Sequence, residues 1–520
     1  MKFTFLFHIL LLIGMLCLSS ACKTRTPKDL SKEALIPYPA SLTATGSSFD
    51  LTNSTTIFLS DDSEQMQAVG AYLARFLKNA TGFSLTIQAS STAPSEGIYL
   101  SIADEPGQQQ EAYQLQIDEQ LVHLSATTPK GLFYGIQTLR QLFPAHIEQQ
   151  APQQGPWEIA TGTIKDAPEF EYRGAMLDVA RHFFTVEDVK RYIDLIAAFK
   201  MNMLHLHLSD DQGWRINIKS WPNLATHGGS TEVGGGEGGY YTQEQYAEIV
   251  SYADSRFITV IPELDMPGHT NAAIASYPDL ECDDREYDLY TGIEVGFSTL
   301  CTRDESIYQF VDDVIREMAA ITPGPYLHVG GDETLATKEE DYIYFTNRIQ
   351  EIVKKYGKTL VGWDEVALAN LQAGSVVQYW DKAENAQMGV KKQAKVIMSP
   401  AKKVYLDMQY VEDYHLGLHW AAYIEAKDAY DWNPLTLVEG IGKEQILGIE
   451  TPLWSETIED MEDIEEMAFP RLPGVAEIAW SPESVRDWET YKTRLGRWKN
   501  RFEAMGINYY ASPQVPWVDE

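Results

Sequence analysis

The chain has 520 residues, of which 44% are hydrophobic and 22% are charged, a composition typical of a folded protein with more than one domain. Its 41 Lys and Arg residues against 75 Asp and Glu residues give a formal net charge of −34. This balance argues against nucleic acid, and against an anionic membrane surface, as a main partner. The 12 Trp, 28 Tyr and 19 Phe residues supply rings that could stack on sugars, although most such rings simply fill protein cores.

Residues 1–21 have the pattern of a secretory signal peptide. Lys2 precedes an apolar run over residues 3–18, and three small residues come directly before Cys22. The run is shorter than the roughly 20 apolar residues that a membrane-spanning helix needs.

Small residues before a cysteine resemble the lipoprotein box of bacteria, which predicts lipidation of Cys22. The protein would then be exported and lipid-anchored in the bacterial cell envelope, on the periplasmic or the surface side of the outer membrane. An ordinary cleaved signal, with Cys22 incidental, is the alternative. We expect the polar residues 22–36 to form a tether.

Two cysteines remain once Cys17 is assigned to the signal and Cys22 to the lipid. These are Cys282 and Cys301. In an oxidising compartment they could pair and close a loop of about 20 residues, while two free buried thiols are the alternative.

Residues 37–168 are predicted to form a small α+β domain. Short apolar runs indicate strands at 56–59, 85–87 and 97–102, a hairpin at 113–117 and 121–124, and helices at 64–79 and 131–143. No reactive cluster is evident here. His123 alternates with apolar neighbours on a strand, which favours a structural role.

Residues 169–520 show strands alternating with helices, the pattern of a parallel α/β fold. Eight strands are predicted, at 174–179, 203–208, 259–263, 326–330, 359–363, 376–380, 396–399 and 446–450. Helices are predicted at 186–200, 242–255, 306–320, 342–356 and 485–505. The number and size of these units predict a (β/α)8 TIM barrel as the main domain.

Polar and aromatic residues follow the predicted strands in turn. After the first four come Asp178, Arg181, His182, Asp210, Asp211, Trp214, Glu263, Asp265, His269, Asp332 and Glu333. After the others come Trp363, Asp364, Glu365, Gln378, Trp380, Asp381, Tyr405, Asp407, Trp454 and Glu456. An Asp-Glu pair alone is typical of a solvated turn or a helix start. Because parallel barrels carry their active sites where the strands end, the whole set favours a functional site instead.

Several kinds of chemistry lack their motifs. The glycines at 234–236 and 238–239 have no P-loop lysine and do not open a helix after a strand, and no Gly-x-Ser-x-Gly elbow is present. His205 and His207 share a strand face without a third ligand of matching type, which favours packing over zinc. Acid and base catalysis by carboxylates on a carbohydrate remains.

These motifs together resemble glycoside hydrolase family 20, the β-N-acetylhexosaminidases. The similarity is carried by His328-Val-Gly-Gly-Asp-Glu333, Arg181, Asp210-Asp-Gln-Gly-Trp214, Gly228-Gly-Ser-Thr-Glu-Val-Gly-Gly-Gly236 and Pro262-Glu-Leu-Asp-Met-Pro-Gly-His269. It extends over nearly the whole mature chain, including Gly135-Ile-Gln-Thr-Leu139 in the small domain.

The resemblance implies roles for the central pair. Glu333 matches the general acid that protonates the glycosidic oxygen and later activates water. Asp332 matches the carboxylate that orients the 2-acetamido group of the substrate, which itself attacks the anomeric carbon. The family is an exception to hydrolysis by two enzyme carboxylates, because this intramolecular attack replaces an enzyme nucleophile.

Further positions match substrate-binding residues of the family. They are Tyr405 on the acetamido oxygen, Trp363, Trp380 and Trp454 around the acetyl group, Arg181, Asp407 and Glu456 on sugar hydroxyls, and Trp432 as a stacking wall. Asp210, Glu263 and His269 resemble partners behind the catalytic pair. Asn433 stands where an acidic residue is common in the family, which weakens the match at Trp432.

The sequence therefore predicts an exo-acting β-N-acetylhexosaminidase that removes terminal GlcNAc or GalNAc from glycans with retention of configuration. No metal and no organic cofactor is implied, and the membrane is contacted only through the lipid. A relative that releases a disaccharide, of the lacto-N-biosidase type, and a non-catalytic glycan-binding lipoprotein are the alternatives.

Overall fold

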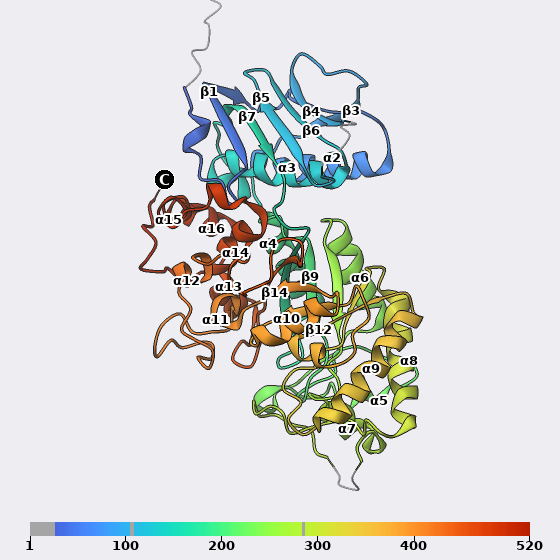
Figure 1. Cartoon of the computed structure of the whole chain (residues 1–520). Coiled ribbons are helices and arrows are strands. Elements are labelled where there is room, and N and C mark those ends of the chain that lie inside the picture. Colours follow the sequence, from blue (N-terminus) through green and yellow to red (C-terminus); the bar gives the residue numbers. More distant parts are fainter. Residues whose placement is uncertain (1–26, 104–108, 283–286, 520) are drawn as a thin grey trace, which may run out of the picture.

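The computed structural model describes residues 27–103, 109–282 and 287–519, which form two domains (Figure 1). The predicted signal peptide and Cys22 lie outside the described residues. Among the described helices, none is both long and apolar enough to span a bilayer.

The small domain is a seven-stranded mixed sheet in the order β1-β7-β5-β6-β4-β2-β3. Its elements are β1 (Ser41–Asp50), β2 (Thr56–Leu59), α2 (Glu64–Thr81), β3 (Thr86–Ala89), β4 (Gly97–Ile102), β5 (Tyr113–Ile117), β6 (Leu121–Ala126), α3 (Pro129–Leu142) and β7 (Glu158–Asp166). Helices α2 and α3 lie on the side of the sheet that faces the second domain (Figure 1). The predicted strands and helices are present, whereas β1 and β7 were not predicted.

The second domain is the predicted TIM barrel, closed in the order β10-β11-β12-β13-β14-β15-β8-β9. Its strands are β8 (Tyr172–Asp178), β9 (Met203–His207), β10 (Thr259–Glu263), β11 (Tyr326–His328), β12 (Thr359–Trp363), β13 (Val376–Tyr379), β14 (Lys395–Met398) and β15 (Ile446–Thr451). All eight pair in parallel. The strands are mostly buried, as expected where helices cover a parallel sheet.

The main helices of the barrel domain are α4 (Val186–Ala198), α6 (Gln243–Asp254), α8 (Glu305–Ile321), α9 (Glu339–Lys355), α10 (Ala383–Lys391), α14 (Arg471–Trp480), α15 (Trp488–Gly496) and α16 (Lys499–Met505). Shorter helices are α5 (Asn223–Thr226), α7 (Asn271–Ser276), α11 (Ala401–Val404), α12 (Ala426–Tyr430) and α13 (Met461–Ala468). The local sequence determines where several of these helices start. Thr185 and Thr242 each form a capping box with the residue three positions on, which satisfies free N–H groups of the first turn.

Two predictions about the chain ends are wrong. Residues 22–36 were expected to be a tether, but from Lys28 onward the segment packs on the small domain. Leu30 and Ile36 are buried, and the Lys28 ammonium donates to the carbonyl of Glu158 at 2.8 Å. The single helix predicted over 485–505 is interrupted at Gly496, where a side chain would collide with the returning C-terminal segment.

Buried ion pairs join the two domains. The ammonium of Lys200, in the barrel domain, lies 3.0 Å from the carboxylate of Asp166 and 3.0 Å from the hydroxyl of Tyr113 in the small domain. Arg501, on α16, is paired with Glu148 at 2.6 Å. Because each charge is buried and hydrogen-bonded, separating the domains would expose partners that are costly to leave unpaired.

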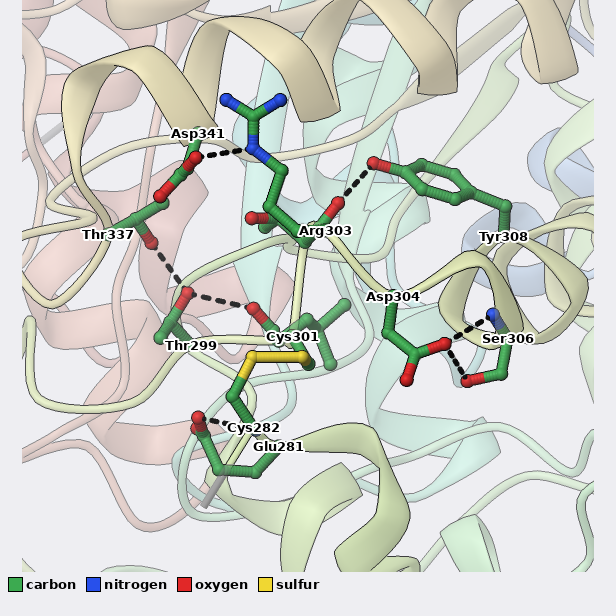
Figure 2. Close-up of a disulfide and its surroundings, with 12 residues drawn as sticks. Glu281, Cys282, Thr299, Cys301, Arg303, Asp304, Ser306, Tyr308, Thr337 and Asp341 are labelled. Carbon is green, nitrogen blue, oxygen red and sulfur yellow. Dashed lines mark hydrogen bonds and ion pairs between the residues drawn. A yellow bond between two sulfur atoms is a disulfide. The ribbon is translucent and has the colours of Figure 1, made fainter.

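Cys282 and Cys301 form a disulfide, which resolves the choice between a bridge and two free thiols (Figure 2). The bridge closes the segment between β10 and α8, and this segment approaches the carboxyl ends of the barrel strands. Ser298, inside the closed loop, donates its hydroxyl to Asp211 at 2.5 Å.

Candidate active site

Four neighbouring strands place titratable residues at one level near the carboxyl end of the barrel. The parallel register pairs Asp178 on β8 with His207 on β9, His207 with Glu263 on β10, and Glu263 with His328 on β11. Residues paired in a parallel register project to the same side of a sheet. The barrel closure therefore gathers these side chains in its interior.

In the loop after β11, two glycines in the left-handed region follow Val329. Gly330 has φ 66°, and a Cβ built there would lie 1.9 Å from the carboxylate of Asp265, so only glycine fits. The next N–H, from Gly331, donates to that carboxylate at 2.9 Å. The close approach sets the direction in which the Asp332-Glu333 pair leaves the strand.

Both Glu333 and His269 have positive φ, 45° and 55° respectively, which is uncommon for residues with a side chain. His269 Nε2 lies 3.9 Å from Asp332 Oδ2 and 3.9 Å from Glu333 Oε2. The Asp332 side chain is 11% exposed and the Glu333 side chain 38% exposed. The structure thus brings the predicted catalytic pair and His269 together, with only Glu333 open to solvent.

The two carboxylates have different environments. Burial, followed by the charge of Asp332, raises the pKa of Glu333 to about 7. A carboxyl group with this pKa holds its proton near neutral pH and remains able to release it. This is the property needed of a group that first donates and then accepts a proton.

A series of alternating carboxylates and imidazoles lies in the barrel interior behind the Asp332-Glu333 pair. Glu450 binds His205 at 2.8 Å, and His205 binds Glu263 at 3.0 Å. Glu263 binds His207, which binds Asp210 at 2.8 Å. Burial alone would lower the pKa of His205, but the charges of Glu450 and Glu263 raise it to about 9. The imidazoles therefore serve as cations between carboxylates rather than as packing alone.

Asp210 is the branch point of this chain. Besides His207, its carboxylate binds the Arg181 guanidinium at 2.8 Å and His269 Nδ1 at 3.1 Å. These three cations hold the pKa of Asp210 well below its usual range, against the effect of burial. For His269, burial would lower the pKa, but Asp210 and Asp265 raise it well above its usual value. The structure therefore places Asp210 against His269, and His269 beside the pair.

Several buried polar atoms around the pair have no hydrogen-bond partner among the described residues. They are Arg181 Nε, His269 Nε2, Asp332 Oδ1, Asp407 Oδ2 and Glu456 Oε2. Asp407 and Glu456 also repel each other, and this adds to burial in raising the pKa of Asp407 well above its usual value. Buried polar groups normally have partners, so this set is suited to a ligand rich in hydroxyl and amide groups.

Aromatic rings surround the same place. Trp363 and Trp454 have centroids 5.6 Å apart, and Tyr405 lies 6.3 Å from Trp454. The indole N–H of Trp363 donates to Glu263 at 2.8 Å, which connects this wall to the charged chain. Trp380 donates to Glu365 at 3.0 Å. Four of the predicted aromatic residues are therefore located around one site.

Trp420 extends this group, although no sequence motif indicated it. Its ring lies 5.9 Å from Trp380 and 6.0 Å from Tyr405, and its side chain is 54% exposed. Trp432, which was predicted as the stacking wall, is buried, and its indole N–H donates to the carbonyl of Ala429 at 3.1 Å. Among the described residues, the ring that contacts the aromatic group is Trp420 and not Trp432, so the prediction for Trp432 is corrected to Trp420.

Two further acids, which were predicted at strand ends but given no role, also lie near the pair. Asp265 accepts from the N–H of Gly331, and burial together with the charge of Asp332 raises its pKa well above the usual value. Burial and the charges of Asp364 and Asp332 raise the pKa of Glu365 to about 8. Both lie in stretches noted as strand ends, and the signal that could have found them is their adjacency to matched motifs.

Among the described residues, three groups of side chains come close enough to hold a metal ion: His205 with Glu263 and His328, Asp210 with Asp265 and His269, and His269 with Asp332 and Glu333. In the first, the nitrogen–oxygen separations are 2.9 and 3.0 Å, which are hydrogen-bond distances. These contacts account for the first cluster as two imidazoles in polar contact with the Glu263 carboxylate.

The catalytic-domain sequence model of glycosyl hydrolase family 20 matches residues 170–342 and 334–483, and the model of domain 2 of the same family matches residues 32–167. The chain belongs to glycoside hydrolase family 20. A β-N-acetylhexosaminidase of Cellulomonas fimi is 40% identical over 93% of this chain and 97% of its own length. A β-hexosaminidase of Porphyromonas gingivalis is 35% identical over 97% of this chain and 68% of its own length.

Solved structures of family 20 agree closely with this fold. The β-N-acetylhexosaminidase of Streptomyces coelicolor superposes with a TM-score of 0.91 at 50% identity, over 95% of this chain and 100% of its own. A mutant Streptomyces plicatus β-hexosaminidase in complex with its product GlcNAc gives the same TM-score and identity, over 95% of this chain and 99% of its own.

Two substitutions test whether Trp420, and not Trp432, is the stacking wall. We expect Trp420→Ala to raise KM for a chromogenic β-GlcNAc glycoside about tenfold, equivalent to roughly 1.4 kcal/mol of lost contact. Trp432→Phe should leave KM within twofold, because that indole is buried and donates its N–H to the main chain. Steady-state kinetics checks both, and the opposite ranking would restore Trp432 as the stacking wall.

The raised pKa of Glu333 predicts a pH dependence. The predicted role of Glu333 as general acid requires its protonated form, so kcat/KM should fall as pH rises through about 7. In Asp332→Asn the neighbouring negative charge is gone, so the pKa of Glu333 should drop and the basic limb of the residual activity should move to lower pH. A limb that moves to higher pH, or does not move, would contradict the assignment.

Proposed function

We propose that this family 20 enzyme is an exo-β-N-acetylhexosaminidase that removes terminal, non-reducing β-linked GlcNAc or GalNAc from glycans. The observation that carries the proposal is the pairing of a carboxyl group of pKa about 7, Glu333, with the buried carboxylate of Asp332 inside a group of aromatic rings. The names of the relatives, β-hexosaminidase and β-N-acetylhexosaminidase, support it.

In the first step the substrate supplies its own nucleophile. The carbonyl oxygen of the 2-acetamido group attacks the anomeric carbon while the bond from that carbon to the glycosidic oxygen breaks. Glu333 gives its proton to the departing oxygen, so an alcohol leaves and an oxazolinium ion remains. Holding the two reacting groups of one molecule in place supplies much of the rate.

Asp332 acts on the charge that this step creates. As the amide oxygen attacks, positive charge develops on the acetamido nitrogen, and a carboxylate beside it stabilises that charge. The Asp332 side chain is buried, so the interaction is screened less by water than it would be at the surface. Tyr405 is assigned to the amide oxygen, and Trp363 and Trp454 to the acetyl methyl group.

In the second step water attacks the anomeric carbon and the oxazolinium ring opens at that carbon. Glu333, now a carboxylate, takes the proton of the attacking water. Two displacements at the same carbon give a product with the β configuration of the substrate. Arg181, Asp407 and Glu456 are assigned to the sugar hydroxyls, and their unpartnered buried atoms support this role.

The lipid anchor and the location belong to the proposal as well. The signal pattern before Cys22 supports export and attachment to the bacterial cell envelope. The alternatives are an enzyme that releases a disaccharide and a glycan-binding lipoprotein without activity. Hydrolysis of a chromogenic β-GlcNAc glycoside, without hydrolysis of the matching disaccharide glycoside, would exclude the disaccharide-releasing enzyme. Any turnover would exclude the inactive glycan-binding lipoprotein.

The roles of the pair are tested by conservative substitutions. Glu333→Gln and Asp332→Asn should each lower kcat on a chromogenic β-GlcNAc glycoside by about 10²–10⁴-fold, the range for loss of acid–base catalysis. Thermal unfolding and circular dichroism should show an intact fold in both. A β-glucoside, with a 2-hydroxyl in place of the amide, should not be turned over by the wild-type enzyme. Unchanged rates in either variant, or brisk cleavage of the glucoside, would contradict the proposal.

A further inference from the structure

The residue two positions after the catalytic acid is an exposed leucine. Leu335 is 81% exposed, the highest fraction for any large hydrophobic side chain in the part of the chain that the structure describes. Its N–H donates to the carbonyl of Glu333 at 2.7 Å, in a tight turn that keeps the two residues together. Single exposed leucines are common on protein surfaces, so exposure alone indicates nothing.

A second loop approaches Leu335 through a glycine, and the residue after that glycine is another exposed apolar one. Gly296, at φ 78°, lies so close that a Cβ built on it would be 2.8 Å from Leu335 Cδ1 and 3.0 Å from the carbonyl oxygen of Glu333. Glycine is therefore required where the two loops meet. Phe297, which follows it, is 42% exposed and packs against Tyr290 with ring centroids 4.7 Å apart. We call Phe297 and Leu335 the apolar rim.

The two loops that carry the apolar rim are fastened to each other. The hydroxyls of Thr299 and Thr337 are hydrogen-bonded at 2.5 Å, and the guanidinium of Arg303 binds Asp341 at 2.5 Å. The Cys282–Cys301 disulfide anchors the first loop beside these contacts (Figure 2). These cross-links fix the loop of Phe297 against the loop of Leu335, and Leu335 is held next to the acid.

The position of the acid indicates what would cover this surface. Glu333 must reach the oxygen of the bond that breaks, and that oxygen carries the leaving group. Asp332 is the more buried of the pair and is assigned to the sugar that is retained. The leaving group therefore extends outward past the exposed side of Glu333, where its main chain turns into Leu335.

We propose that Phe297 and Leu335 bind the leaving group and favour substrates whose leaving group has an extended apolar face. The C–H face of a second pyranose ring and an aromatic ring both have this chemistry, and apolar contact with either would be made as water leaves the rim. The inference rests on the proposed function, because it assumes that Glu333 protonates the glycosidic oxygen.

The test compares leaving groups of different size on the intact enzyme. Methyl β-GlcNAc has almost no leaving group, chitobiose has a second sugar, and 4-nitrophenyl β-GlcNAc has an aromatic ring. Leu335→Ala is expected to lower the ratio of kcat/KM for the larger substrates to kcat/KM for the methyl glycoside about three- to tenfold, since contacts to a group absent from the methyl glycoside are lost. Phe297→Ala should lower the same ratio.

Leu437→Ala provides the matched control, because Leu437 is also exposed but lies in the segment after Trp432. It should leave every ratio unchanged. A ratio that falls only for chitobiose identifies a sugar as the occupant, and one that falls only for the nitrophenyl substrate identifies an aromatic group. Equal losses of kcat/KM on all three substrates would mean that Leu335 acts through Glu333. No loss of kcat/KM would mean that the apolar rim does not contact the leaving group. Either result overturns the inference. Failure of the wild-type enzyme on all three would instead refute the proposed function.

Discussion

The structure depends on neutralising carboxylates that are crowded and buried at the mouth of the barrel. Glu450, Glu263 and Asp210 are linked through the imidazoles of His205 and His207, so each negative charge lies next to a positive one. A buried charge that loses its partner costs several kcal/mol, so the members of such a chain hold one another in place. The chain ends at Asp210, which passes this constraint to Arg181 and His269.

This arrangement explains how neighbouring carboxyl groups can have different protonation states. Asp210 is surrounded by three cations and stays ionised. Glu333 lies at the open end of the site with Asp332 beside it, and His269 approaches its carboxyl group only to 3.9 Å. The aromatic group lowers the polarity around the pair, and Trp363 connects that wall to Glu263 by a hydrogen bond. Charge, ring packing and proton affinity are therefore set by one connected structure.

The sequence predicted the parts that repeat or carry strong patterns. All eight barrel strands were located to within a few residues, because buried parallel strands are continuous apolar runs. Strand β1 was missed because it is a polar edge strand, rich in Ser and Thr, that pairs only with β7. The packing of residues 28–36 was missed because a few apolar residues, among them Leu30 and Ile36, are surrounded by polar ones.

Site residues were predicted where they lie next to distinctive motifs. They were missed where the conformation of a loop determines which side chain reaches the site. Trp420 and Trp432 are both in the long connection after β14, and only three-dimensional packing places one of them beside Tyr405. The roles of His205 and His207 as charged links also required the structure, since the partners Glu450 and Glu263 lie far away along the chain. Chain spacing carries no information about such contacts.

The central claim is that the substrate amide, and not an enzyme side chain, attacks the anomeric carbon. The most direct measurement is kcat/KM for 4-nitrophenyl glycosides of glucosamine whose N-acetyl group carries zero, one, two or three fluorine atoms. Fluorine withdraws electrons from the amide oxygen and weakens it as a nucleophile while leaving the sugar and the leaving group unchanged. The account predicts a steep, progressive fall in kcat/KM across the series. A rate that is insensitive to fluorine would contradict it.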